Sequence, residues 1–175
     1  MKAMKWFIGI AVLLAAVVLG GGMAISPGFV VTRSVVIDAP ADKVFGLLED
    51  PRAWKRWSVW NRRDPNMQIE YQGPQTGNGA QWSWHSRTEG DGAMTFVRVD
   101  PGKRLGYELF IADFGSTSSG AFDLEPQGAH TRVTWWMRGD MGANPLMRWM
   151  SLLADRMVGK DFEAGLANLK TLAEQ

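Results

Sequence analysis

The sequence predicts an α+β fold in which a curved antiparallel sheet of seven strands surrounds one long C-terminal helix. Two observations predict it. From residue 30 onward, runs of alternating apolar and polar residues recur, and the segments between them are short and rich in turn residues, as antiparallel neighbours require. After residue 144, the apolar residues instead follow helical spacing to the C-terminus. One apolar sheet face that closes on one apolar helix stripe gives a two-layer domain.

The first strand is predicted over residues 30–38, and two short helices follow it. Pro40 suits the first turn of a helix over residues 39–50, because its fixed φ is already helical. Asp50-Pro51 ends this helix, and residues 51–58 form the second one. The six remaining strands are expected at residues 67–73, 79–87, 92–100, 103–111, 116–126 and 129–139.

The long helix is predicted to begin at Asn144-Pro145. We expect one apolar stripe along it to face the sheet. This stripe consists of Leu146, Met150, Leu153 and Met157, and it resumes after Gly159 with Phe162, Leu166 and Leu169. We expect Asp161 and Glu163 to lie on the outer side of the helix.

Residues 1–28 are predicted to be an N-terminal membrane anchor that precedes a domain of residues 29–175. Lys2 and Lys5 are followed by no charge until Arg33, and residues 6–25 are long enough to cross the hydrocarbon core. The lysines place the N-terminus in the cytoplasm, so we expect a single-pass protein of the inner, cytoplasmic membrane with a periplasmic domain. A cleaved signal peptide is the alternative, with residues 22–24 as a small-x-small cleavage site.

Composition excludes several kinds of site. The chain has no cysteine, so neither a disulfide framework nor a thiolate metal site is possible. Its net charge of +1 does not favour polyanions. His85 and His130, the only histidines, are too far apart in sequence to suggest a metal site. We therefore expect no metal, no cofactor and no nucleic-acid partner.

Five stretches together resemble a known family. They are residues 35–60, 71–86, 90–96, 131–139 and 157–172. In order and spacing, they are similar to the SRPBCC superfamily, also called START-like or helix-grip, and within it to the polyketide cyclase/dehydrase-like group, in which an apolar N-terminal span also occurs. The resemblance covers about residues 30–173 and implies the helix-grip fold. It leaves the activity open, because this superfamily includes lipid carriers, cyclases, hydroxylase domains and non-enzymatic binders.

Residues 54–63 place Trp54, Trp57 and Trp60 among four cations. Bases could stack on such rings, but Glu49, Asp50 and other acidic neighbours argue against a nucleic-acid platform. A membrane-interface helix and a plain part of the core are the other interpretations. The resemblance places this segment at one end of the helix-grip cavity, where the rings would be both core and cavity wall and the cations would extend outward.

Other aromatic and methionine side chains are expected to line the same cavity. Alternation along the strands puts Trp82 on the same face as Trp84. The predicted ligand-binding residues are Trp54, Trp57, Trp60, Trp82, Trp84, Phe122, Trp135, Met150, Leu153 and Met157. Such a surface suits a hydrophobic small molecule or a lipid. The alternative is that these side chains fill the space completely.

The sequence shows no convincing catalytic set. His85 is the best candidate for a general base, but alternation places it opposite Trp84 and so toward solvent. No catalytic residue is therefore predicted. The favoured hypothesis is a non-catalytic, membrane-anchored binding domain. A cyclase or dehydrase acting on an aromatic or polyketide-like substrate is the first alternative, and a protein or membrane interaction module is the second.

Overall fold

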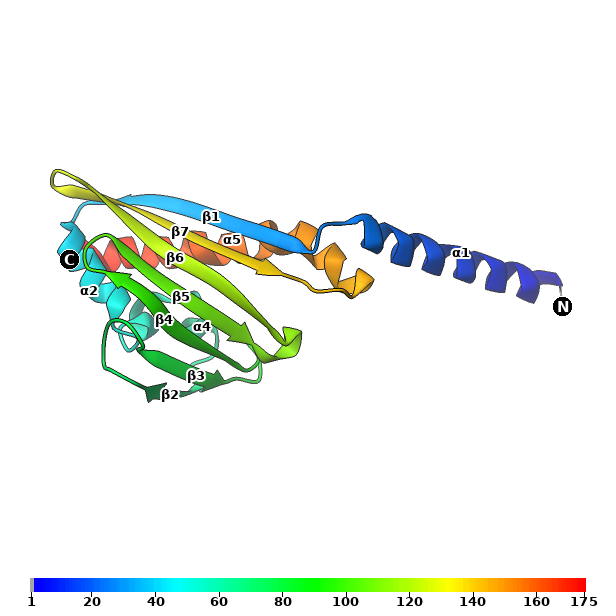
Figure 1. Cartoon of the computed structure of the whole chain (residues 1–175), viewed down its shortest axis with the longest axis horizontal. Helices are drawn as coiled ribbons and strands as arrows, with labels where there is room; N and C mark the ends of the chain where they lie inside the picture. The colour runs from blue at the N-terminus through cyan, green and yellow to red at the C-terminus, as the bar shows by residue number, and fades with distance from the viewer. Residues whose placement is uncertain (1) are drawn as a thin grey trace.

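The computed structural model describes residues 2–175. An N-terminal helix is followed by a strand, three short helices, six more strands and a long helix (Figure 1). The helices are α1 (Lys2–Ala24), α2 (Ala41–Glu49), α3 (Trp54–Trp57), α4 (Val59–Arg63) and α5 (Pro145–Ala173), with a 3₁₀ turn at Ala112–Phe114. The strands are β1 (Gly28–Ile37), β2 (Gln68–Gln72), β3 (Gln81–His85), β4 (Gly92–Asp100), β5 (Arg104–Ile111), β6 (Ser116–Gln127) and β7 (His130–Asp140).

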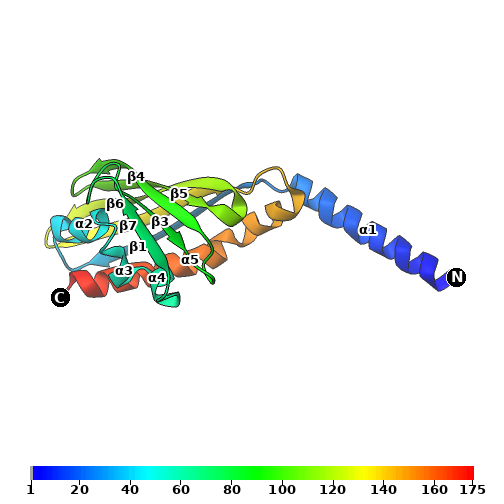
Figure 2. The same ribbon diagram turned by 90° about the horizontal axis from the view of Figure 1, so that it is seen from below.

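The seven strands form one antiparallel sheet in the order β1-β7-β6-β5-β4-β3-β2. From β2 to β7, each strand pairs with the next in the chain, and β1 closes the series by pairing with β7. This arrangement confirms the predicted fold class. α5 lies along one face of the sheet, so the domain has the two expected layers (Figures 1 and 2).

The second short helix, predicted over residues 51–58, is the single turn α3, and a further single-turn helix that was not predicted, α4, follows it. α3 ends where Ser58 adopts an extended conformation, with φ −65° and ψ 132°, and α4 begins immediately after it. Together they position Trp54 and Trp57 in the core, and Trp60 at its edge.

α5 begins as predicted, because the side chain of Asn144 accepts a hydrogen bond from the backbone N–H of Leu146 at 2.9 Å. The prediction that one stripe of this helix faces the sheet is wrong for its first half. Phe162, Leu166 and Leu169 are buried, whereas Leu153 and Met157 are 47% and 55% exposed. From Met157 to Phe162 the helix turns by about 140° beyond a full turn, at about 100° per residue, so the two apolar stripes lie on different sides.

α1 extends away from the domain at the end of the sheet where β1 begins (Figures 1 and 2). Its segment Met4–Ala24 has a mean hydropathy of 2.4 and is long and apolar enough to cross a membrane, a test that signal sequences also pass. The end of α1 packs on the start of α5. A Cβ atom on Gly21 would lie 2.8 Å from the Trp149 ring, and one on Gly22 would collide with the carbonyl of Pro145. The glycines therefore allow close helix contact.

Candidate ligand-binding site

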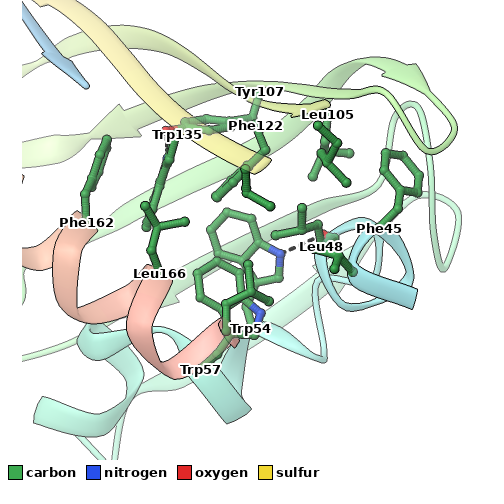
Figure 3. Close-up of a cluster of buried hydrophobic side chains, with 14 of the residues drawn as sticks. Phe45, Leu48, Trp54, Trp57, Leu105, Tyr107, Phe122, Trp135, Phe162 and Leu166 are labelled. Atoms are coloured by element: carbon green, nitrogen blue, oxygen red, sulfur yellow. Dashed lines mark hydrogen bonds between the residues drawn. The ribbon is translucent and has the colours of Figure 1, made fainter. Parts of the chain in front are cut away.

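Aromatic rings from α3, five strands and α5 meet between the sheet and α5 (Figure 3). The Trp54 ring lies 4.6 Å from Trp57 and 5.1 Å from Trp82, centroid to centroid. Trp135 on β7 stacks on Phe162 of α5 at 3.8 Å, with 6° between the ring planes. The same cluster includes Phe96, Tyr107 and Phe122. This cluster is well packed, so most of the rings that were expected to line a cavity form the core.

The indole N–H groups of Trp54 and Trp57 are paired within the fold. The Trp54 indole donates to the Leu48 carbonyl at 2.8 Å, and the Trp57 indole donates to the Leu47 carbonyl at 3.2 Å. Both acceptors lie at the end of α2, whose last carbonyls are available for such bonds. The two tryptophans therefore fix α3 against α2 as well as filling the core.

Tyr107 is a buried phenol in the middle of the cluster. The Trp135 indole donates to its oxygen at 2.8 Å. Burial raises the pKa of Tyr107 well above its usual value, and the hydrogen bond from Trp135 offsets only part of this effect. Its ring fits because the facing residue is Gly120, where any Cβ would collide with the ring. Tyr107 is thus a neutral hydroxyl at physiological pH.

Trp60 and Trp84 connect this core to the surface, because both are half-buried and both pack against the buried cluster. The Trp60 ring lies 5.9 Å from Trp135, and its indole donates to the Asp161 carboxylate on α5 at 3.0 Å. Strand alternation had predicted that Trp84 faces the core and His85 faces solvent, and the structure confirms both.

A salt bridge holds α4 against α5 beside Trp60. The Arg63 guanidinium donates to Asp161 through two nitrogens, one at 3.0 Å, and lies 3.5 Å from Glu89 in the β3–β4 turn. The hydrogen bond with Asp161 is the main cause of the raised pKa of Arg63. We call Trp60, Arg63, Glu89 and Asp161 the mouth cluster. Asp161 was expected on the outer side of the helix, and its pairing with α4 corrects this.

The histidines lie away from the aromatic core. His85 is exposed, and its Nδ1 is 2.6 Å from an Asp91 carboxylate oxygen. His130 pairs in the same way with Asp38 at 2.8 Å. Within residues 2–175, no group of three or more His, Asp or Glu side chains is arranged to hold a metal ion.

The ten predicted ligand-binding residues separate into three groups. Five are buried in the core, and these are Trp54, Trp57, Trp82, Phe122 and Trp135. Trp60, Trp84 and Met150 are half-buried, whereas Leu153 and Met157 are exposed. Sequence reasoning missed Tyr107, Arg63 and Asp161, because their partners lie far away in the chain. The contact between Trp60 and Asp161, for instance, spans 101 residues.

An open depression of about 730 Å³ lies elsewhere, where β1 begins and β7 ends. Phe29, Glu108, Ser119, Arg138 and Asp140 are among its lining residues, and none of the ten predicted residues contributes to it. Two of these side chains already bind each other, because Arg138 donates to Ser119 at 3.1 Å. This depression is therefore an open surface feature separate from the aromatic core.

Residues 28–174 match the family described as polyketide cyclase/dehydrase and lipid transport. The chain belongs to this family, as the sequence resemblance had implied. The match begins at the first residue of β1, so it leaves α1 outside the family region. No curated protein sequence matches the chain.

Solved structures show the same fold. A Thermobifida fusca protein is 24% identical, with a TM-score of 0.62, over 82% of this chain and 92% of its own. Norcoclaurine synthase from Thalictrum flavum, in complex with dopamine and hydroxybenzaldehyde, is 13% identical, with a TM-score of 0.62, over 86% and 89%. A Chromobacterium violaceum protein is 14% identical, also at 0.62, over 83% and 97%. At these identities, the likeness establishes the helix-grip fold.

Proposed function

We propose that this protein is a membrane-anchored START-like domain that binds a hydrophobic small molecule or a lipid and does not catalyse a reaction. α1 is the anchor, the domain begins near residue 29, and the domain lies on the periplasmic side of the cytoplasmic membrane. The family's description, which includes lipid transport, supports the ligand class. The two lysines that precede the apolar span support the orientation.

One observation carries the proposal: a continuous aromatic surface runs from the buried core to the half-buried Trp60 and Trp84. A ligand on this surface would contact rings, with few polar groups to orient it. The charged groups beside it, Arg63 and Asp161, already satisfy each other. An apolar ligand fits such a surface better than a polar one.

The ligand enters by moving α4 away from α5. Because the rings are closely packed, binding requires this movement. α3 and α4 are single turns with little intrinsic stability. The polar links across the opening are those of the mouth cluster and those of Asn168 on α5, which accepts from Arg62 and donates to the Trp57 carbonyl. Ser58, which joins the two helices, has a buried hydroxyl with no partner among the described residues. Opening would hydrate this hydroxyl, which lowers the cost of the movement.

The test is binding of an apolar fluorescent probe, such as an anilinonaphthalene sulfonate, to the full chain. The detergent concentration is kept below the level at which detergent competes with the probe. Trp84→Ala and Trp60→Ala should each weaken probe binding at least about tenfold, because each removes a ring worth roughly 1.4 kcal/mol or more of contact. His85→Ala is the matched control, since this neighbour of Trp84 is exposed. Equal effects of Trp84→Ala and His85→Ala would contradict the proposed site. Native mass spectrometry of gently extracted protein should also show a co-purified lipid or apolar molecule.

A catalytic function is the second candidate, because Asp161 bonds to a ring of the proposed site and is largely shielded from solvent. In a cyclase or dehydrase, this carboxylate would act as the acid or base on an aromatic substrate. The fold similarity to norcoclaurine synthase motivates this candidate. Asp161→Asn distinguishes the two functions. In a binder, it should change only probe binding, because it weakens the mouth cluster that must open. Loss of turnover of an aromatic or polyketide-like substrate, with probe binding retained, would favour the enzyme.

A further inference from the structure

The first half of α5 carries an exposed apolar stripe that the proposed ligand site does not use. Its five members are between 40% and 62% exposed, and they are Leu146, Trp149, Leu152, Leu153 and Met157. Together we call them the α5 stripe. They recur at helical spacing, so they form one continuous surface. A soluble surface rarely places this many large apolar side chains side by side without a partner.

The α5 stripe lies on the side of the helix away from the sheet. Ala154 and Phe162, which face the core, are 4% and 0% exposed. In Figure 2, the first half of α5 borders open space on the side opposite the strands. The stripe is therefore not a misplaced part of the core, and something outside the domain must cover it.

The same stripe is continuous with α1. The indole of Trp149 donates to the Val18 carbonyl at 3.0 Å, and its ring lies against Gly21. Arg148 donates to the Met23 carbonyl at 3.1 Å, and the Ser151 hydroxyl donates to the Ser26 carbonyl at 2.8 Å. These contacts attach the start of α5 directly to the end of α1. If α1 crosses a bilayer, the start of α5, with Leu146 and Trp149, must lie at the bilayer surface.

The charges around the stripe favour the same partner. Arg156 and Lys160 are exposed near its far end. The acidic residues of this part of α5 are turned toward β1, where Arg33 binds Asp155 at 2.8 Å and Glu163 at 2.5 Å. The outer side of α5 is thus apolar with a basic border. This is the pattern of a helix that lies in the headgroup region of a membrane with anionic lipids.

We propose that the α5 stripe docks on the surface of the bilayer that α1 enters. Leu146, Trp149, Leu152, Leu153 and Met157 reach the boundary between headgroups and acyl chains, while Arg156 and Lys160 contact anionic headgroups. This inference rests on the proposed insertion of α1. It gives the membrane-interface role to α5, whereas the tryptophans of α3 face inward.

The absence of cysteine from the chain allows a direct test, because a single introduced cysteine can be spin-labelled without background. The full chain is reconstituted into vesicles of phosphatidylcholine and phosphatidylglycerol. Leu153→Cys and Met157→Cys report on the stripe, and Leu13→Cys reports on α1. Thr32→Cys, exposed on the opposite layer, is the matched control. Collisional relaxation by oxygen and by a water-soluble nickel chelate is then measured for each label.

The ratio of oxygen to nickel accessibility should be at least about threefold higher at positions 153 and 157 than at position 32, as for a helix at the acyl boundary. The label at position 13 should be still more lipid-exposed. A lipid-like label at position 13 with water-like labels at 153 and 157 would overturn the docking proposal and leave the anchor intact. A water-like label at position 13 would overturn both. Spin–spin broadening at 153 and 157 would show that a second copy covers the stripe, and would also overturn the proposal that the stripe docks on the bilayer.

Discussion

Trp135 and Tyr107 satisfy each other inside the core, where neither side chain reaches water. Two such amphipathic rings can be buried only when their polar atoms find partners. Alternation along β7 predicts correctly that Trp135 faces inward. It does not predict the partner, because Tyr107 lies 28 residues earlier, on a strand that β6 separates from β7. Alternation along one strand shows to which face a side chain points. Its partner on another strand depends on the register of the sheet, which the alternation does not show.

The first prediction concerns this hydrogen bond. Tyr107→Phe should lower the free energy of unfolding by about 1–3 kcal/mol, because it leaves the buried Trp135 N–H without an acceptor. Denaturant-induced unfolding measures the change. Tyr71→Phe is the control, since Tyr71 is half-buried and its ring packs at the edge of the core. A Tyr107→Phe protein as stable as the Tyr71→Phe protein would mean that the bond contributes nothing.

The raised pKa of Tyr107 predicts the alkaline behaviour. In the folded protein this pKa lies above the value of about 10 that the unfolded chain has, so the unfolded state loses its proton first. Stability from this group is therefore complete below about pH 10 and decreases as the pH rises toward the folded pKa. Unfolding free energies at pH 9 and pH 11 should differ less for Tyr107→Phe than for the natural sequence. An equal difference would show that Tyr107 is not the group responsible.

At the scale of elements, α5 contains two apolar stripes. The first covers Leu146 to Met157 and faces outward, while the second begins at Phe162 and faces the sheet. The sequence contains this information, because the interval between Met157 and Phe162 does not continue a four-three spacing. Only one stripe can face the sheet, but the spacing alone does not say which. The first stripe includes Trp149, which bonds to α1, and α1 lies outside the domain. This contact therefore agrees with the outward position of the first stripe.

The two stripes predict different costs of truncation. Phe162→Ala should lower the free energy of unfolding by about 3–5 kcal/mol, because it removes a fully buried ring stacked on Trp135. Leu153→Ala should change it by less than about 0.5 kcal/mol in detergent solution, because that side chain is exposed. Thermal unfolding of both variants tests the assignment. A large loss of stability for Leu153→Ala but not for Phe162→Ala would mean that the first stripe, and not the second, faces the sheet.

At the scale of the whole molecule, the chain has two parts with different surroundings. Nearly every large side chain of α1 is exposed, whereas the core of the domain is made by residues from β1 onward. The sequence predicts this division well, because a long apolar run without a polar face differs sharply from alternating strands. The contact between the end of α1 and the start of α5 is tertiary, so no local pattern predicts it.

This division predicts that residues 26–175 fold without α1. Among the described side chains of α1, residues 4–24, none is part of the hydrophobic core cluster, and the contacts at Gly21 and Gly22 involve only the first turns of α5. The shortened protein should unfold cooperatively, with near-ultraviolet circular dichroism from its buried tryptophans. Removal of α1 uncovers Trp149 and Pro145, so the measurement is made with a low concentration of detergent. Loss of cooperative unfolding would show that α1 is structurally required and that the domain boundary is wrong.

The last prediction concerns the orientation of the whole chain in the membrane. Lys2 and Lys5 precede the apolar span, and such residues remain on the cytoplasmic side. An alkaline phosphatase fused after Gln175 should therefore be active, whereas a fluorescent protein that matures only in the cytoplasm should not. The double variant Lys2→Glu with Lys5→Glu tests whether the lysines set the orientation, because it removes the positive charge before the span. It should reduce the phosphatase signal. An active cytoplasmic reporter on the natural sequence would contradict the orientation.

Sequencing the N-terminus of the mature protein separates the two forms of export, because an intact Lys2 identifies an anchor and a start near Ile25 identifies a cleaved signal peptide.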